Sequence, residues 1–93
     1  MLYSINSKLT NFSPKFKTGM ITATTNENGY IATNIPLTSK FICSATVNGN
    51  GYVCVPVRVN GDVWWFYVFG TSNGYVVPTK NATFNISYYY YDL

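Results

Sequence analysis

The fold of this chain is decided by residues 52–69, which read YVCVPVRVNGDVWWFYVF. Two runs rich in valine and aromatic residues, which favour β-strands, flank the dipeptide Asn60-Gly61. Asn-Gly between two such runs is the strongest short-range signal for a β-hairpin, because both residues tolerate a positive φ. The stretch therefore predicts two antiparallel strands joined by a tight turn.

A two-residue loop at Asn60-Gly61 sets the register that we expect for this hairpin. Val59 then pairs with Asp62, and one wholly apolar face results, made of Val57 opposite Trp64, Val55 opposite Phe66 and Val53 opposite Val68. The other face carries Trp65, Tyr67 and Phe69, where a half-buried strand would carry polar side chains. Either both faces are buried, or the second face contacts another molecule.

Strand-like runs and turn residues continue on both sides of this hairpin. The further strands that we expect cover residues 22–25, 30–35, 41–47, 75–77 and 83–91. Short strands at regular spacing with Asn-, Gly- and Pro-containing turns are typical of sandwiches and barrels. We predict an all-β fold, a jelly-roll-like antiparallel β-sandwich of six to seven strands, over residues 19–93.

Residues 1–18 follow a different pattern. Apolar residues recur at spacings of three, four and three, as in a coiled coil, at Leu2, Ile5, Leu9 and Phe12. About ten residues cannot hold a helix alone in water, and Pro14 disfavours helix in the residue before it. We expect this segment to be either the end of a coiled-coil stalk, a short stub before the head domain, or an irregular lead-in.

Aromatic residues make up 18% of the chain, and strand alternation sorts them into two sets. We expect core packing for the first set, which comprises Trp64, Phe66, Phe84 and Tyr88, together with Ile86, which lies between two of them on the same face. Because Tyr and Trp are enriched at interfaces, we expect an oligomer interface for the second set, which comprises Trp65, Tyr67, Phe69, Tyr89 and Tyr91. Such rings also stack on sugars, so a ligand contact is the alternative.

The two cysteines allow two interpretations. A two-residue loop at Asn48-Gly49 would place Cys43 opposite Cys54 and permit a disulfide. A loop longer by one residue gives a uniform apolar core face and puts the cysteines on opposite faces, where they cannot bond. We favour the second register and free thiols, which suit folding in a reducing cytoplasm.

The composition argues against several classes of function. The chain has no His and only three scattered carboxylates, so an acid–base pair, a Cys-His nucleophile and a four-ligand zinc site find no support. We therefore predict no enzymatic activity, no cofactor and no metal site. A net charge of +3 without a basic cluster argues against nucleic-acid binding. No apolar run reaches the ~18–20 residues of a membrane-spanning helix, so we expect no membrane insertion.

Low charge bears on assembly. Only 10% of the residues are charged, which is little for a free monomer, and a core built from 93 residues is thin. Together with the coiled-coil spacing and the aromatic second face, this favours a homotrimer. The first residues show no basic or apolar segment of a signal peptide, so we expect either no obvious secretory route or a piece of a longer protein.

Several motifs resemble the C-terminal head (receptor-binding) domains of bacteriophage tail-fibre and tail-spike proteins. The string INSKLT at residues 5–10 resembles the end of a fibre coiled coil, and TATTNENGYIAT at residues 22–33 resembles the opening of these heads. A strand like ICSA at 42–45, a W-x-F-x-V element at 64–68 and a tyrosine-rich strand at 86–91 follow in the same order. The resemblance covers most of the chain from residue 19 onward.

This resemblance implies a β-sandwich head, usually homotrimeric, on a fibre that recognises a host-surface receptor. We therefore expect a non-enzymatic adhesion module that binds a host-surface glycan or another receptor. Its place would be the tail-fibre tip of a virion made in the bacterial host cytoplasm. The alternative is a structural trimerisation cap or spacer without a ligand, whose aromatic residues are all buried.

Loops at one end of the sandwich are the expected binding site if trimer contacts use the flat aromatic face. Alternating hairpins bring the turns at 48–51 and 70–74 to the same end. The candidate ligand-binding residues are Asn48, Asn50, Tyr52, Thr71, Ser72, Asn73 and Tyr75. Amides and hydroxyls suit neutral sugar hydroxyls, and the tyrosines could stack on sugar rings. The alternative is that these are turn residues selected for positive φ.

Overall fold

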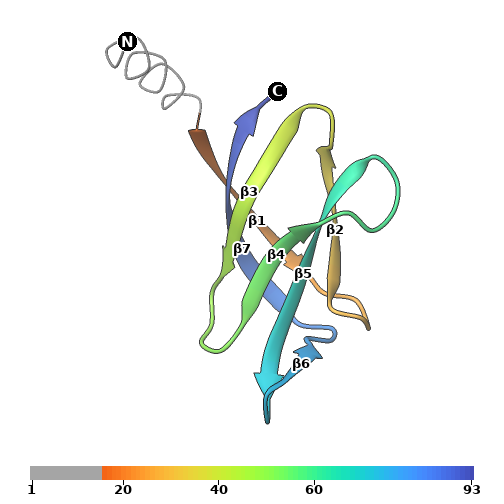
Figure 1. Cartoon of the computed structure of the whole chain (residues 1–93), viewed down its shortest axis with the longest axis vertical. Coiled ribbons are helices and arrows are strands. Elements are labelled where there is room, and N and C mark those ends of the chain that lie inside the picture. The colour runs from red at the N-terminus through yellow and green to blue at the C-terminus, as the bar shows by residue number, and fades with distance from the viewer. Residues whose placement is uncertain (1–15) are drawn as a thin grey trace, which may run out of the picture.

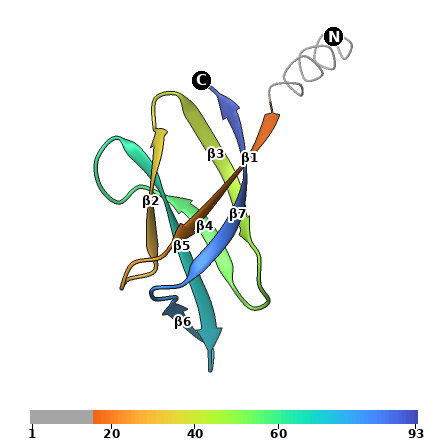
Figure 2. The same cartoon turned by 180° about the vertical axis from the view of Figure 1, so that it is seen from behind.

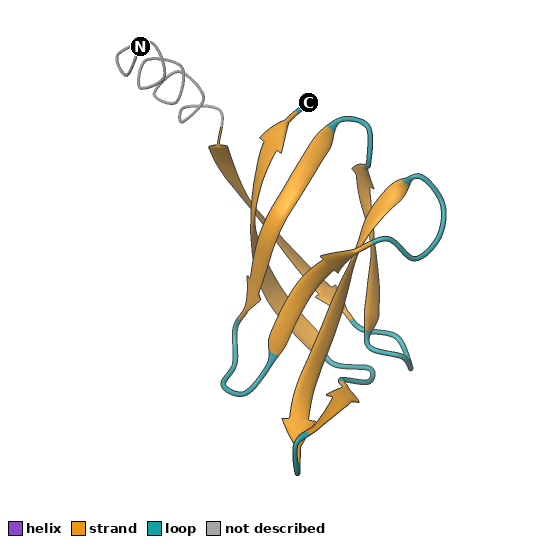
Figure 3. Cartoon of the chain, viewed as in Figure 1, coloured by secondary structure: helices purple, strands orange, loops and turns teal. Residues whose placement is uncertain are grey.

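Residues 16–93 are described by a computed structural model, and every regular element in this part of the chain is a β-strand (Figure 3). The seven strands are β1 (Phe16–Thr24), β2 (Tyr30–Pro36), β3 (Lys40–Val47), β4 (Val53–Val57), β5 (Val63–Ser72), β6 (Tyr75–Pro78) and β7 (Thr83–Asp92). They form two antiparallel sheets, which confirms the predicted all-β sandwich of six to seven strands. Within these residues, no helix is long and apolar enough to cross a membrane.

The two sheets have different strand orders (Figure 1). The first sheet has the order β1-β7-β3, and Figure 2 shows β1 and β7 from the other side. The second sheet is built on β5, whose Tyr67 pairs with Tyr30 of β2 and also with Val55 of β4. Phe69 likewise pairs with Val53 of β4 and with Pro78 of β6. Strands β2 and β6 therefore lie along one edge of β5, and β4 lies along the other.

The core lies between the sheets and is built by alternation along β5 and β7. All five residues that the sequence predicts in the core are buried, namely Trp64, Phe66, Phe84, Ile86 and Tyr88. Ile31, Ile42, Cys54 and Val68 complete the cluster. Strand periodicity was a sufficient guide here because both central strands run without a bulge through the core.

The predicted register of β4 against β5 is wrong by one residue. Val57 pairs with Trp65, not Trp64, and the connecting loop spans residues 58–62. The predicted tight turn requires a positive φ at both central residues, and at this turn only Gly61 has one, at 73°. Because a one-residue shift exchanges the two faces, the β4 valines point outward, and Cys54 enters the core.

Strands β3 and β4 do not form the predicted hairpin, because they belong to different sheets. β3 pairs with β7, and a bulge at Cys43 lets Ile42 and Ala45 share the inward face. Cys43 is exposed, Cys54 is buried, and both thiols are free, as predicted. Burial raises the pKa of the Cys54 thiol to about 12.

The predicted stalk or lead-in of residues 1–18 lies mostly outside the described residues and stays a prediction. β1 begins at Phe16, whose Cα pairs with that of Tyr91, so residues 16–18 belong to the first sheet. The start of β1 and the C-terminus lie at one end of the sandwich (Figure 1). The β3–β4 loop and the β5–β6 turn lie at the opposite end, which we call the far end.

Candidate functional site

A pocket of about 420 Å³, open to solvent, lies at the far end of the sandwich. Three short segments contribute its walls: the β3–β4 loop, the last residues of β5, and the end of β6 with Thr79 after it. The lining residues are Asn50, Gly51, Tyr52, Gly70, Thr71, Ser72, Val77, Pro78 and Thr79. None of them is charged, so the side chains of the pocket are amide, hydroxyl, aromatic and aliphatic groups.

The β3–β4 loop is fixed by contacts with β7. The Asn48 side-chain oxygen accepts a hydrogen bond of 2.7 Å from the backbone N–H of Asn85. The Asn48 N–H donates in return to the Asn85 carbonyl oxygen over 3.1 Å. These two bonds hold the loop against the first sheet and present the following residues, 50–52, to the pocket.

Tyr52 lines the pocket, and its ring is held in place by neighbouring residues. Its ring packs edge-to-face on the buried Phe84, with centroids 5.1 Å apart. A Cβ on Gly49 would lie 3.2 Å from the ring, so only glycine leaves this side of the ring uncrowded. The side chain is still 44% exposed. A ring that is held in place and partly open to water suits stacking against a planar apolar surface.

The backbone geometry of the turn between β5 and β6 explains one of the predicted site residues, Asn73. Asn73 has a φ of 52° and Gly74 a φ of 81°, and Ser72 pairs with Tyr75 across them. This is the two-residue hairpin turn that Asn-Gly favours. Asn73 thus serves the turn, and Tyr75, 75% exposed, stands outside the pocket lining.

The structure brings together four of the seven candidate residues, namely Asn50, Tyr52, Thr71 and Ser72. Asn48 anchors the loop rather than lining the pocket. Sequence reasoning missed Val77, Pro78 and Thr79, although a signal was present. Extending the Asn73-Gly74 hairpin in register places Val77 opposite Gly70, next to the predicted loop.

Polar groups in this pocket are free to bind a ligand. The side chains of Asn50, Thr71, Ser72 and Thr79 make no hydrogen bond with any other residue of 16–93. An amide and three hydroxyls can both donate and accept, as neutral hydroxyl ligands require. Over the same residues, no three Cys, Asp or Glu side chains lie close enough to hold a metal ion.

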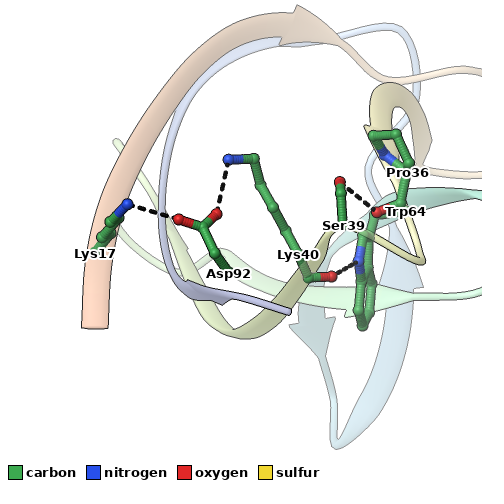
Figure 4. A network of polar contacts seen from close by, with 6 residues as sticks. All are labelled: Lys17, Pro36, Ser39, Lys40, Trp64 and Asp92. Atoms are coloured by element: carbon green, nitrogen blue, oxygen red, sulfur yellow. Dashed lines mark hydrogen bonds and ion pairs between the residues drawn. The ribbon is translucent and has the colours of Figure 1, made fainter. Parts of the chain in front are cut away.

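Three charged residues, Lys17, Lys40 and Asp92, lie together at the other end of the sandwich, whereas Lys80 follows directly after the lining residue Thr79. The Asp92 carboxylate accepts hydrogen bonds from Lys17 of β1 over 2.6 Å and from Lys40 of β3 over 3.3 Å (Figure 4). These hydrogen bonds lower the pKa of Asp92. The bond from Lys17 has the largest effect, and the bond from Lys40 has the next largest. These two ion pairs connect both edge strands of the first sheet, β1 and β3, to its central strand β7 beside the C-terminus.

The predicted oligomer-interface residues are divided between two surfaces. Trp65, Tyr67 and Phe69 lie together on the outer face of the second sheet. Tyr89 and Tyr91 lie on the outer face of the first sheet, because β7 belongs to that sheet. The two sets are on opposite sides of the sandwich and do not form one surface.

No protein-family model, no curated protein and no solved structure matches this chain. The resemblance to tail-fibre heads therefore stays a prediction from the sequence motifs, and the functional argument depends on the geometry of the far-end pocket.

Proposed function

We propose that this chain is a non-enzymatic adhesion module, the distal head of a bacteriophage tail fibre, and that its far-end pocket binds a neutral glycan on the host surface. The observation that carries this proposal is the position of the pocket. Residues 1–15 precede β1, which starts at the opposite end of the sandwich. A stalk joined there would direct the pocket away from the fibre and toward a host cell.

The chemistry of the pocket favours a neutral saccharide. Sugar-binding sites combine an aromatic ring, which contacts the apolar C–H face of the sugar, with amides and hydroxyls that bond its hydroxyl groups. Tyr52 supplies the ring, and Asn50, Thr71, Ser72 and Thr79 supply the polar groups. A charged saccharide would find no counter-charge among the lining residues.

Assembly and location follow from the same proposal. A homotrimer would present three pockets on one fibre tip, and simultaneous engagement raises avidity without any new contact. The free thiols suit synthesis in the cytoplasm of the bacterial host before incorporation into the virion.

A binding comparison on whole cells tests the proposal. The triple variant Asn50→Ala, Thr71→Ala and Ser72→Ala removes polar groups from the pocket. The matched control, Asn34→Ala, Ser44→Ala and Thr46→Ala, removes the same types of group from exposed positions on other strands. Against a panel of bacterial strains, we expect the pocket variant to lose at least about tenfold in affinity and the control to bind normally. Periodate oxidation of the cell surface should abolish binding of the unaltered chain.

A structural cap without a ligand is the second candidate, and the aromatic outer face of the second sheet favours it. Such a cap leaves no role for a half-exposed Tyr52 beside free amides and hydroxyls. Equal binding by the pocket variant and its control, or binding to no strain in the panel, would favour the cap.

A further inference from the structure

We infer that Gly70 keeps a slot open in the far-end pocket, and that this slot takes the acetamido group of a 2-acetamido sugar. The inference rests on the proposed function and adds to it the class of saccharide that the pocket prefers. Gly70 lines the pocket together with Tyr52 and Val77, and these three residues define the slot.

The position of Gly70 continues the inward face of β5. Trp64, Phe66 and Val68 are buried at alternate positions of this strand, and Gly70 follows at the same spacing. A side chain at this position would extend toward Tyr52. Because glycine has no side chain, the row of inward side chains on β5 stops at Val68, and the slot begins there.

Neither the backbone nor the neighbouring atoms require glycine at this position. Gly70 does not have a positive φ, unlike Gly49 and Gly51 in the facing loop. An added Cβ would lie 3.4 Å from the Gly51 carbonyl oxygen and 3.9 Å from the Tyr52 ring, which are ordinary contact distances. Glycine weakens a strand, and inside one it often marks close approach of a ligand or of another backbone. The room for a Cβ beside Gly51 argues against the second reason and for the first.

The walls of the slot combine apolar surface with one hydrogen-bond acceptor. Val77 is the cross-strand partner of Gly70, so its side chain lies on the same face of the sheet, where it is 45% exposed. The Tyr52 ring borders the same space. The Gly51 carbonyl oxygen, the atom nearest to the added Cβ, accepts no hydrogen bond from another residue of 16–93.

An acetamido group matches these walls in shape and chemistry. Its methyl group can pack on Val77 and the edge of the Tyr52 ring, and its N–H can donate to the Gly51 carbonyl oxygen. A hydroxyl group at the same carbon of the sugar would leave Val77 exposed to water. Asn50 and Thr71 remain free to bond the hydroxyl groups elsewhere on the sugar ring.

Titration of paired methyl glycosides into the ¹⁵N-labelled chain tests this inference. The pairs are N-acetylglucosamine with glucose and N-acetylgalactosamine with galactose, and the two sugars of a pair differ only at carbon 2. With sugar added up to about 50 mM, we expect an N-acetyl sugar to bind about tenfold more tightly than its partner. The amides of Gly51, Gly70 and Val77 should shift most. No preference for the N-acetyl sugar in either pair would overturn the inference.

Two substitutions and a matched control test the slot itself. Gly70→Ala places a methyl group in the slot, and Val77→Ala removes an apolar wall. Each should reduce the preference for the N-acetyl sugar at least about threefold. Val76→Ala should leave it unchanged, because Val76 is exposed and lies outside the pocket lining. Urea denaturation checks that each variant is folded, and an unchanged preference in either folded slot variant would overturn the inference.

Inhibition of whole-cell binding separates this inference from the proposed function. The free N-acetyl sugar should inhibit binding of the unaltered chain to a responsive strain at a lower concentration than its paired sugar. If the variant at Asn50, Thr71 and Ser72 loses binding but the paired sugars inhibit equally, the proposed function stands and acetamido recognition is wrong. If that variant binds as well as its control, the proposed function fails, and this inference fails with it.

Discussion

The indole N–H of Trp64 donates a hydrogen bond of 2.8 Å to the carbonyl oxygen of Lys40, which ties β5 of the second sheet to β3 of the first (Figure 4). The Trp64 side chain is only 6% exposed, and its ring meets Phe41 edge-to-face at 5.9 Å. This bond joins the two layers of the sandwich at the end where β1 begins.

We predict that Trp64→Phe lowers the free energy of unfolding by about 2 kcal/mol, because the Lys40 carbonyl loses its donor and the smaller ring leaves a void. Urea denaturation measures this change. Trp65→Phe is the matched control, since the Asn60 carbonyl that it would release is on an exposed loop where water can replace the indole. Equal losses in the two variants would show that the link between the sheets contributes nothing specific.

Gly19 and Tyr88 are a second pair that constrains the sandwich. They are cross-strand partners, and a Cβ on Gly19 would clash with the Cζ atom of the Tyr88 ring. We predict that Gly19→Ala destabilises the fold by about 1–3 kcal/mol, because the buried ring must move. In a Tyr88→Ala background, the same substitution should cost far less, since the clash is gone.

Gly70→Ala is the control for this measurement. The nearest atom to its added Cβ would be a backbone oxygen at 3.4 Å, so its own cost should stay small. If Gly19→Ala costs the same with and without the Tyr88 ring, the ring is not the reason for glycine at this position.

The two thiols should differ in reactivity. Cys43 is exposed at the bulge in β3, whereas Cys54 is buried and its pKa is raised to about 12 by that burial. Because the thiolate is the reactive species, a disulfide reagent should titrate one thiol per native chain and two after unfolding. Cys43→Ser should abolish the native reaction, and a native chain with two reactive thiols would contradict the placement of Cys54 in the core.

Asp92 should contribute stability that depends on pH. Hydrogen bonds from Lys17 and Lys40 lower its folded-state pKa below the ordinary value of 3.8. The contribution is therefore complete above that ordinary value and is lost as the pH falls through the folded-state pKa. The melting temperature of Asp92→Asn should be lower than that of the unaltered chain at pH 7, and the difference should vanish in strong acid.

Salt and a matched variant check this assignment. Lys17 and Asp92 are about half exposed, so 1 M salt should reduce the difference at pH 7. Asp62→Asn makes the same chemical change where no ion pair forms within residues 16–93, and it should show no such pH-dependent loss. A difference that persists unchanged in acid would mean that Asp92 acts by packing rather than by charge.

Most strands lie where the sequence predicts them, because glycine, proline and asparagine mark most strand ends. The prediction for β1 was wrong, since β1 begins at Phe16, six residues before the predicted strand 22–25, and Gly19 and Gly70 lie inside strands. The register of β4 against β5 could not be read from the sequence, since Asn60 does not take the positive φ that its dipeptide permits. The pattern of neighbouring residues in the sequence also does not show which strands belong to the same sheet. The Asn48-Gly49 turn connects two layers instead of two paired strands, and only tertiary contacts such as that of Asn48 with Asn85 determine this.

The site was predictable in part for the same reasons. Successive antiparallel strands place alternate loops at the same end, which brings Asn50 near Thr71 and Ser72. Which loop residues serve a ligand and which serve the turn depends on φ and on hydrogen bonds. Asn48 and Asn73 therefore differ from Asn50 in role, although the sequence presents all three as turn asparagines.

Mapping a bound saccharide onto the head by NMR tests the central claim most directly. The unlabelled ligand would be surface polysaccharide released from a strain that the chain binds, titrated into ¹⁵N-labelled protein. The account predicts that amide shifts concentrate at residues 50–52, 70–72 and 77–79, around the far-end pocket. Shifts confined to the outer face of either sheet, or none at all, would contradict it.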